Sequence, residues 1–113
     1  MSKVSENIAS KIAVECSDEE NSAFDQMTIM MIASFVIQLA KAIYECRKNK
    51  NKTIEAMQNP SFMYRILLGR RVSKFIKDNN LKIKKAALMD ALLKTKFSKE
   101  EVSLLVAEAL SND

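Results

Sequence analysis

Apolar residues recur along most of this chain at intervals of three and four, the spacing that places them on one face of an α-helix. The first such run contains Val4, Ile8, Ala9, Ile12 and Cys16. The last run contains Val102, Leu105, Val106, Ala109 and Leu110. The whole pattern predicts helices over residues 1–17, 18–48, 60–78, 81–94 and 98–111.

The second of these segments is the most apolar part of the chain. Its polar positions form one narrow stripe, at Ser34, Gln38, Lys41, Glu45 and Lys48. A helix that is apolar on nearly all sides has to be covered on nearly all sides. We therefore expect a second copy of the chain, or a larger partner, to help cover it; packing within the chain's own core is the alternative. The candidate contact residues are Met27, Met30, Met31, Phe35 and Ile37.

Short motifs mark the expected helix ends. Two serine–glutamate pairs, Ser17 with Glu20 and Ser98 with Glu101, fit the capping box, in which each side chain binds a backbone N–H at a helix start. Asn followed by Pro at residues 59–60 is also typical of a start. Residues 78–80, Asp-Asn-Asn, suit a helix end. Residues 47–52 are expected to be a charged connector or a frayed end, with a candidate short helix over residues 53–58.

The composition narrows the fold to one class. The chain has 113 residues, 48% of them hydrophobic, with one glycine, one proline and no histidine. That length suits one domain that buries its own core. Folds rich in β-strands need frequent turns, which depend on glycine and proline, so these folds are excluded. We predict a single all-α domain, an irregular bundle of four to five helices.

The single glycine, Gly69, lies in the middle of the helix expected over residues 60–78. Before it, one face of that helix carries Phe62, Met63, Ile66 and Leu67. In the second half of the helix, which starts at Leu68, the roughly opposite face carries Leu68, Val72, Phe75 and Ile76. The helix is therefore expected to change its buried side at Gly69, either through close packing against another helix or through a kink.

Charge is distributed unevenly along the chain. The formal net charge is +4, but residues 1–50 carry −1, residues 51–97 carry +8 and residues 98–113 carry −3. Such a basic block is either a solvated face or a surface that attracts nucleic acid, an acidic protein or an anionic lipid. The candidate anion-binding residues are Arg65, Arg70, Arg71, Lys74, Lys77, Lys82, Lys84 and Lys85.

The sequence offers little to build a catalytic or metal site. Without histidine, the usual general base and the Ser-His or Cys-His pairs are missing, and one glycine does not make a phosphate-binding loop. We expect no enzyme activity, no cofactor, no metal and no small-molecule substrate. The two cysteines, Cys16 and Cys46, are expected to be buried thiols rather than a disulfide.

Targeting signals are also missing from the sequence. The first twelve residues contain three charged side chains and no apolar stretch, so we expect no secretory signal. The longest uncharged run, residues 26–40, has 15 residues, whereas a membrane-spanning helix needs about 20, so a membrane span is not expected. These features favour a cytoplasmic protein.

The remaining functions all involve a macromolecular partner. The leading expectation is a non-catalytic interaction or assembly protein that self-associates or docks on a larger partner through its central helix. One alternative is sequence-independent nucleic-acid binding through the basic face over residues 65–85. Another is a small helical inhibitor or immunity-type protein, which the sequence does not distinguish from the first.

Overall fold

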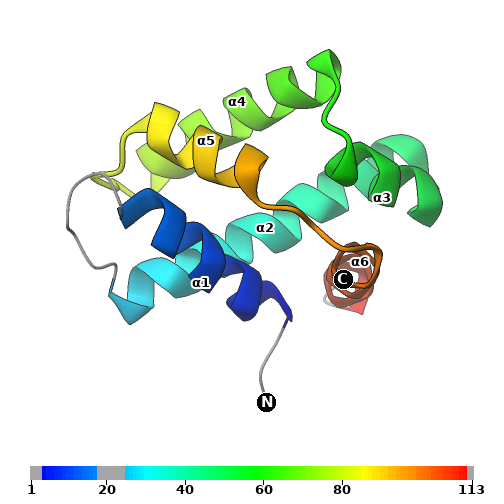
Figure 1. Ribbon diagram of the computed structural model, residues 1–113, viewed down its shortest axis with the longest axis horizontal. Coiled ribbons are helices and arrows are strands. Elements are labelled where there is room, and N and C mark those ends of the chain that lie inside the picture. Colours follow the sequence, from blue (N-terminus) through cyan, green and yellow to red (C-terminus); the bar gives the residue numbers. More distant parts are fainter. Residues whose placement is uncertain (1–3, 18–24, 112–113) are drawn as a thin grey trace.

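The computed structural model describes residues 4–17 and 25–111, which form six helices and no strand. The helices are α1 (Val4–Ser17), α2 (Gln26–Arg47), α3 (Lys50–Gln58), α4 (Phe62–Asp78), α5 (Lys85–Lys94) and α6 (Lys99–Ser111) (Figure 1). The all-helical class is confirmed. The expected number of four to five helices is too low, because α3 is a separate helix.

Two residues between α2 and α3 are enough to separate these helices. Lys48 adopts the left-handed conformation with φ of 53°, and its N–H binds the carbonyl of Tyr44, which ends α2. The next residue, Asn49, caps α3 by accepting a hydrogen bond from the Lys52 N–H at 2.9 Å. Most of the stretch expected as a connector is therefore helical.

The start of α4 lies later than predicted. Asn59 does not cap this helix; its backbone N–H binds the Glu55 carbonyl and closes α3. The cap is Ser61, whose Oγ accepts from the Tyr64 N–H at 3.2 Å. The cap predicted from Asn-Pro is therefore two residues too early, because Asn59 ends α3, which was expected only as a candidate short helix. Likewise, α5 begins at Lys85 rather than at residue 81.

Other predicted ends are confirmed. Asn79 caps α4, and Asn80 follows in the left-handed conformation with φ of 51°. At the start of α6, the Ser98 N–H donates to the Glu101 carboxylate at 2.9 Å and the Glu101 N–H donates to Ser98 Oγ at 3.0 Å, a complete capping box. The pair Ser17 and Glu20 extends beyond the described residues. Helix α2 begins at Gln26, after its extended cap Asp25, so the helix predicted over residues 18–48 does not run unbroken.

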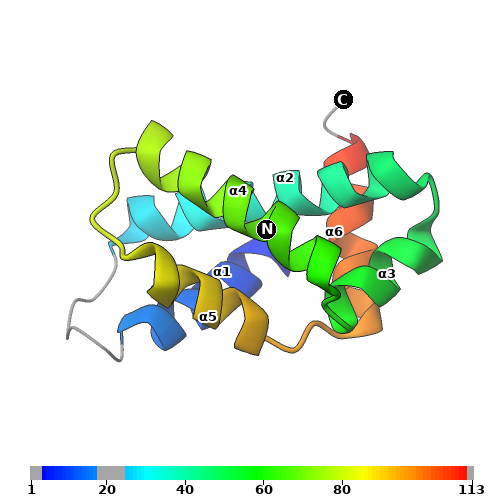
Figure 2. The same cartoon turned by 90° about the horizontal axis from the view of Figure 1, so that it is seen from above.

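Helix α2 is the centre of the bundle, and α1, α3, α4 and α6 all pack against it (Figures 1 and 2). Helix α5 lies on α1 and α4 instead. Along α2 the fully buried side chains are Ile32, Val36, Leu39 and Ala40. The chain's own helices thus supply much of the cover that the apolar central helix requires.

Within the described residues, α2 is also the one helix long and apolar enough to cross a membrane, judged by length and composition alone. Central helices of globular domains pass the same test. In this structure, four other helices of the chain pack on α2.

The two cysteines have different environments and no disulfide joins them. Cys16 is buried, whereas Cys46 is exposed. The expectation of two buried thiols is therefore wrong for Cys46, which lies next to Glu45 in the polar stripe of α2.

Candidate protein-docking and anion-binding surface

Helix α4 buries a single face along its whole length. The buried residues are Tyr64, Leu68, Val72 and Phe75. Phe75 packs against Phe35 of α2, so this contact helps to hold α4 on the bundle. Burial raises the pKa of the Tyr64 hydroxyl above its ordinary value, which keeps that side chain neutral in the core.

The opposite side of α4 is uncovered by the described residues. We call it the outer face of α4, and it consists of Phe62, Met63, Ile66, Arg70, Ser73 and Lys77. Phe62 is 75% exposed and Met63 is 69% exposed. The predicted change of buried side at Gly69 is therefore wrong. Of the face expected to be buried before Gly69, Phe62, Met63 and Ile66 are exposed and only Leu67 packs partly against the core.

Gly69 lies in an unbroken stretch of α4, beside Met89 of α5. A Cβ atom added at Gly69 would meet the Met89 Cε at 3.9 Å, an ordinary van der Waals distance. Neither close approach of two backbones nor a break in the helix accounts for this glycine.

A shallow groove, here called the basic groove, follows the outer face of α4 to the start of α5. Its cationic side chains are Arg65, Arg70, Lys74, Lys77 and Lys85. Asp78 is the one carboxylate in this lining, and it pairs with Lys74 at 2.9 Å. The structure therefore brings five of the eight predicted anion-binding residues together with little neutralising charge.

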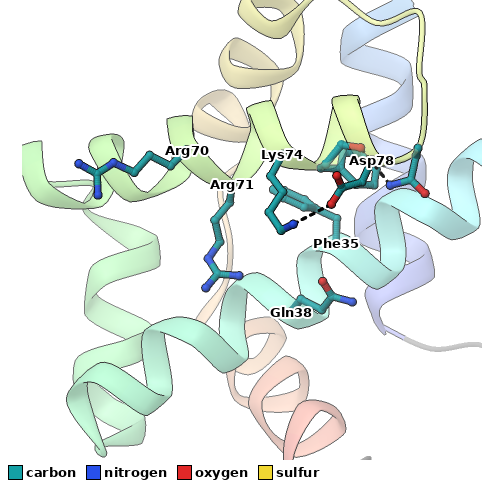
Figure 3. A pocket seen from close by; sticks show the side chains of 8 residues that line it. Phe35, Gln38, Arg70, Arg71, Lys74 and Asp78 are labelled. Atoms are coloured by element: carbon teal, nitrogen blue, oxygen red, sulfur yellow. Dashed lines mark hydrogen bonds and ion pairs between the residues drawn. The ribbon is translucent and has the colours of Figure 1, made fainter.

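A second hollow lies on the other flank of α4, between α4 and α2 (Figure 3). Arg71 points across it towards α2, where Gln38 lies, while Arg70 points away (Figure 3). Arg71 lines this hollow and not the basic groove, although the two hollows share Arg70, Lys74 and Asp78. The last two predicted residues, Lys82 and Lys84, lie in the segment before α5 and line neither hollow.

The predicted contact residues of α2 are scattered by the fold. Phe35 is only 5% exposed, in the contact with Phe75, and Met31 and Ile37 are half-buried. Met27 and Met30, in the first turns of α2, are exposed. The large uncovered apolar side chains therefore lie mainly on other helices.

Helix α6 carries another uncovered surface, which the sequence pattern did not predict. Its outer face consists of Glu100, Leu104, Ala107 and Ser111, all exposed, with exposed Leu110 at its edge. Leu104 is 56% exposed. Leu104 does not belong to the run of apolar residues with helical spacing in α6. This position outside the run was the feature of the sequence that could have indicated an exposed apolar surface.

Two carboxylates of α6 are used within the chain rather than on its outer face. Glu108 accepts a hydrogen bond from Ser5 of α1 at 3.2 Å, and Glu101 pairs with Lys11 of α1 at 3.0 Å. Partial burial alone would raise the pKa of Glu101, but the Ser98 and Lys11 hydrogen bonds outweigh it and lower that pKa. Glu100 remains on the outer face as an exposed acidic group.

Across residues 4–17 and 25–111, no three cysteine or acidic side chains gather closely enough to hold a metal ion. A scan against protein-family models and searches of curated proteins and of solved structures gave no match. The outer face of α4, with its apolar first half and basic second half, is the surface on which a function can be argued.

Proposed function

We propose that this chain is a non-catalytic interaction or assembly protein that docks a protein partner through the outer face of α4. The observation that carries the proposal is the exposure of Phe62 and Met63 next to the arginines of the same helix. Contiguous exposed apolar patches mark interaction sites. Covering a side chain of this size contributes about 1.5–3 kcal/mol.

The residue types on this face favour a protein partner. The cores of protein–protein interfaces are enriched in aromatic residues, methionine and arginine, and are poor in lysine. The first half of the outer face, with Arg65 beside it, has that composition, and the lysines lie towards its end. Surrounding positive charge steers an acidic partner and sets its orientation. The proposal places the docking surface on α4 rather than on α2, where Phe35 is buried.

A photo-reactive amino acid placed at Phe62, in the cells that naturally make this chain, tests the proposal. We expect it to capture a defined protein, either this chain or another, and the capture to be lost when Arg70→Glu is added. The same amino acid at Lys52, an exposed site on α3, is the control. If Phe62 captures no protein, or captures the same proteins as Lys52, the docking role of α4 is rejected.

Sequence-independent nucleic-acid binding is a second candidate, supported by the convergence of five cationic side chains on the basic groove. Such binding should weaken steeply with salt, because each phosphate contact releases counterions. Charge reversal at Arg70, Lys74 and Lys77, which all line the groove, should abolish it, whereas Phe62→Ser with Met63→Ser should leave it intact. Unchanged affinity for duplex DNA and RNA after the charge reversal would exclude this candidate.

A further inference from the structure

We propose that the partner on the outer face of α4 is a second copy of this chain, which presents the outer face of its α6; this deepens, and rests on, the proposed docking role of α4. On both faces apolar residues lie beside a charged residue, but the charges are opposite and the order along the helix is reversed. Along α4, apolar Met63 and Ile66 precede cationic Arg70. Along α6, anionic Glu100 precedes Leu104 and Ala107.

The spacing of these residues fits two antiparallel helices. Counting from Glu100, the next outer positions follow after four and seven residues, at Leu104 and Ala107. Counting backwards from Arg70, they follow after four and seven residues as well, at Ile66 and Met63. At 1.5 Å per residue, each ridge is about 10 Å long. An antiparallel arrangement would place Glu100 at Arg70 and Leu104 at Ile66.

Burial within one chain leaves both faces available for this contact. Helix α4 packs on α2 and α5 through its opposite side, and α6 packs on α1, α2 and α3 through its own apolar stripe. Phe62 then meets the end of α6, near exposed Leu110. The contact would therefore cover the apolar residues on both faces together.

Pairing α4 with α4 of a second copy is less favourable. If two such helices cross at Gly69, Met63 of each lies against the basic half of the other, and no carboxylate faces Arg70 or Lys77. The contact between α4 and α6 avoids this mismatch. The contact joins two different surfaces, so a pair of copies still has one free outer face of α4 and one free outer face of α6. Further copies can therefore add head to tail.

Two assembly-defective variants give the sharpest test. Arg70→Glu disables the outer face of α4 and Leu104→Asp disables that of α6; both residues are exposed, so circular dichroism and thermal unfolding should match the parent protein. A single pair of helices buries less than a standard interface, so a concentration series up to about 300 μM is needed to populate a weak contact.

In sedimentation or light scattering, we expect the average mass of the parent protein to rise with concentration above the 12.8 kDa of one chain. Each variant alone should stay at that mass. An equimolar mixture should form a dimer of twice that mass and nothing larger, because only one functional pair of faces remains. Met27→Ser and Lys52→Glu, at exposed sites elsewhere, should associate like the parent protein.

A charge exchange tests the pairing of Arg70 with Glu100 directly. Glu100→Arg should abolish association on its own, as Arg70→Glu does, and mixing the two variants should restore it, since each contact then joins opposite charges. The inference is overturned if mixtures stay monomeric, or if Leu104→Asp alone associates like the parent protein. A parent protein that stays monomeric also overturns it but leaves a different partner for α4, which the cross-link at Phe62 would still detect.

Discussion

The rings of Phe35 in α2 and Phe75 in α4 lie with their centroids 4.7 Å apart and their planes inclined by 32°. This contact joins the central helix to the helix that carries the proposed docking surface. Because α4 otherwise rests mainly on the short helix α5, the two rings make a large contribution to its attachment.

We expect Phe35→Ala to destabilise the fold by about 3–5 kcal/mol, the usual cost of removing a buried phenylalanine side chain. Phe62→Ala is the matched control, because the same side chain is removed from an exposed position and should change stability by less than about 0.5 kcal/mol. Chemical denaturation of both variants measures the difference. Equal effects would mean that the contact between Phe35 and Phe75 does not hold α4 in place.

Local motifs were predictable from the sequence where the interacting residues are neighbours along the chain. The capping box of Ser98 and Glu101 spans three residues, and the Asp-Asn-Asn helix end needs only its own backbone conformation. The all-helical class followed from the spacing of apolar residues and the shortage of turn residues. These features depend little on the rest of the fold.

The exposed side of α4 was not predictable in the same way. Both of its apolar sets, one with Phe62 and Met63 and one with Val72 and Phe75, have helical spacing, so the pattern alone does not say which is buried. The choice depends on residues distant in sequence, above all Phe35 and α5. The presence of apolar residues on two opposite faces of α4 was nevertheless a feature of the sequence that indicated a docking surface, because the described part of the chain covers only one of these faces.

Gly69→Ala is expected to stabilise the protein by about 1 kcal/mol, since alanine is the better helix former and the added Cβ meets Met89 at an ordinary distance. Thermal unfolding measures the change. Ala107→Gly, at an exposed helical position on α6, is the reverse control and should destabilise by a similar amount. A loss of stability in Gly69→Ala would show that α4 needs its glycine for packing or bending.

The two thiols should differ sharply in reactivity. Burial, with a smaller effect of the nearby Glu15 charge, raises the pKa of Cys16 to about 11. At pH 8, roughly one Cys16 in a thousand is then a thiolate, the reactive form. A disulfide reagent should modify one thiol per folded chain, the exposed Cys46, and both thiols in denaturant. If folded Cys46→Ser reacts as fast as the parent protein, Cys16 is accessible and the packing of α1 on α5 is not as described.

Stability should depend on pH through Glu101, which joins the cap of α6 to Lys11 of α1. Its pKa in the folded protein lies below the ordinary value of 4.5, so its carboxylate stabilises the fold fully above that pH and loses this effect as the pH falls through the folded pKa. Glu101→Gln keeps the capping geometry but loses the charge that pairs with Lys11, so it should cost up to about 1 kcal/mol at pH 7 and progressively less in acid, measured by urea unfolding at each pH. Glu100→Gln, one residue earlier and exposed, loses only the attraction of its charge to the start of α6 and should cost less at pH 7. If Glu100→Gln and Glu101→Gln gave the same curve, general charge rather than the bonds to Ser98 and Lys11 would control the acid stability of the bundle.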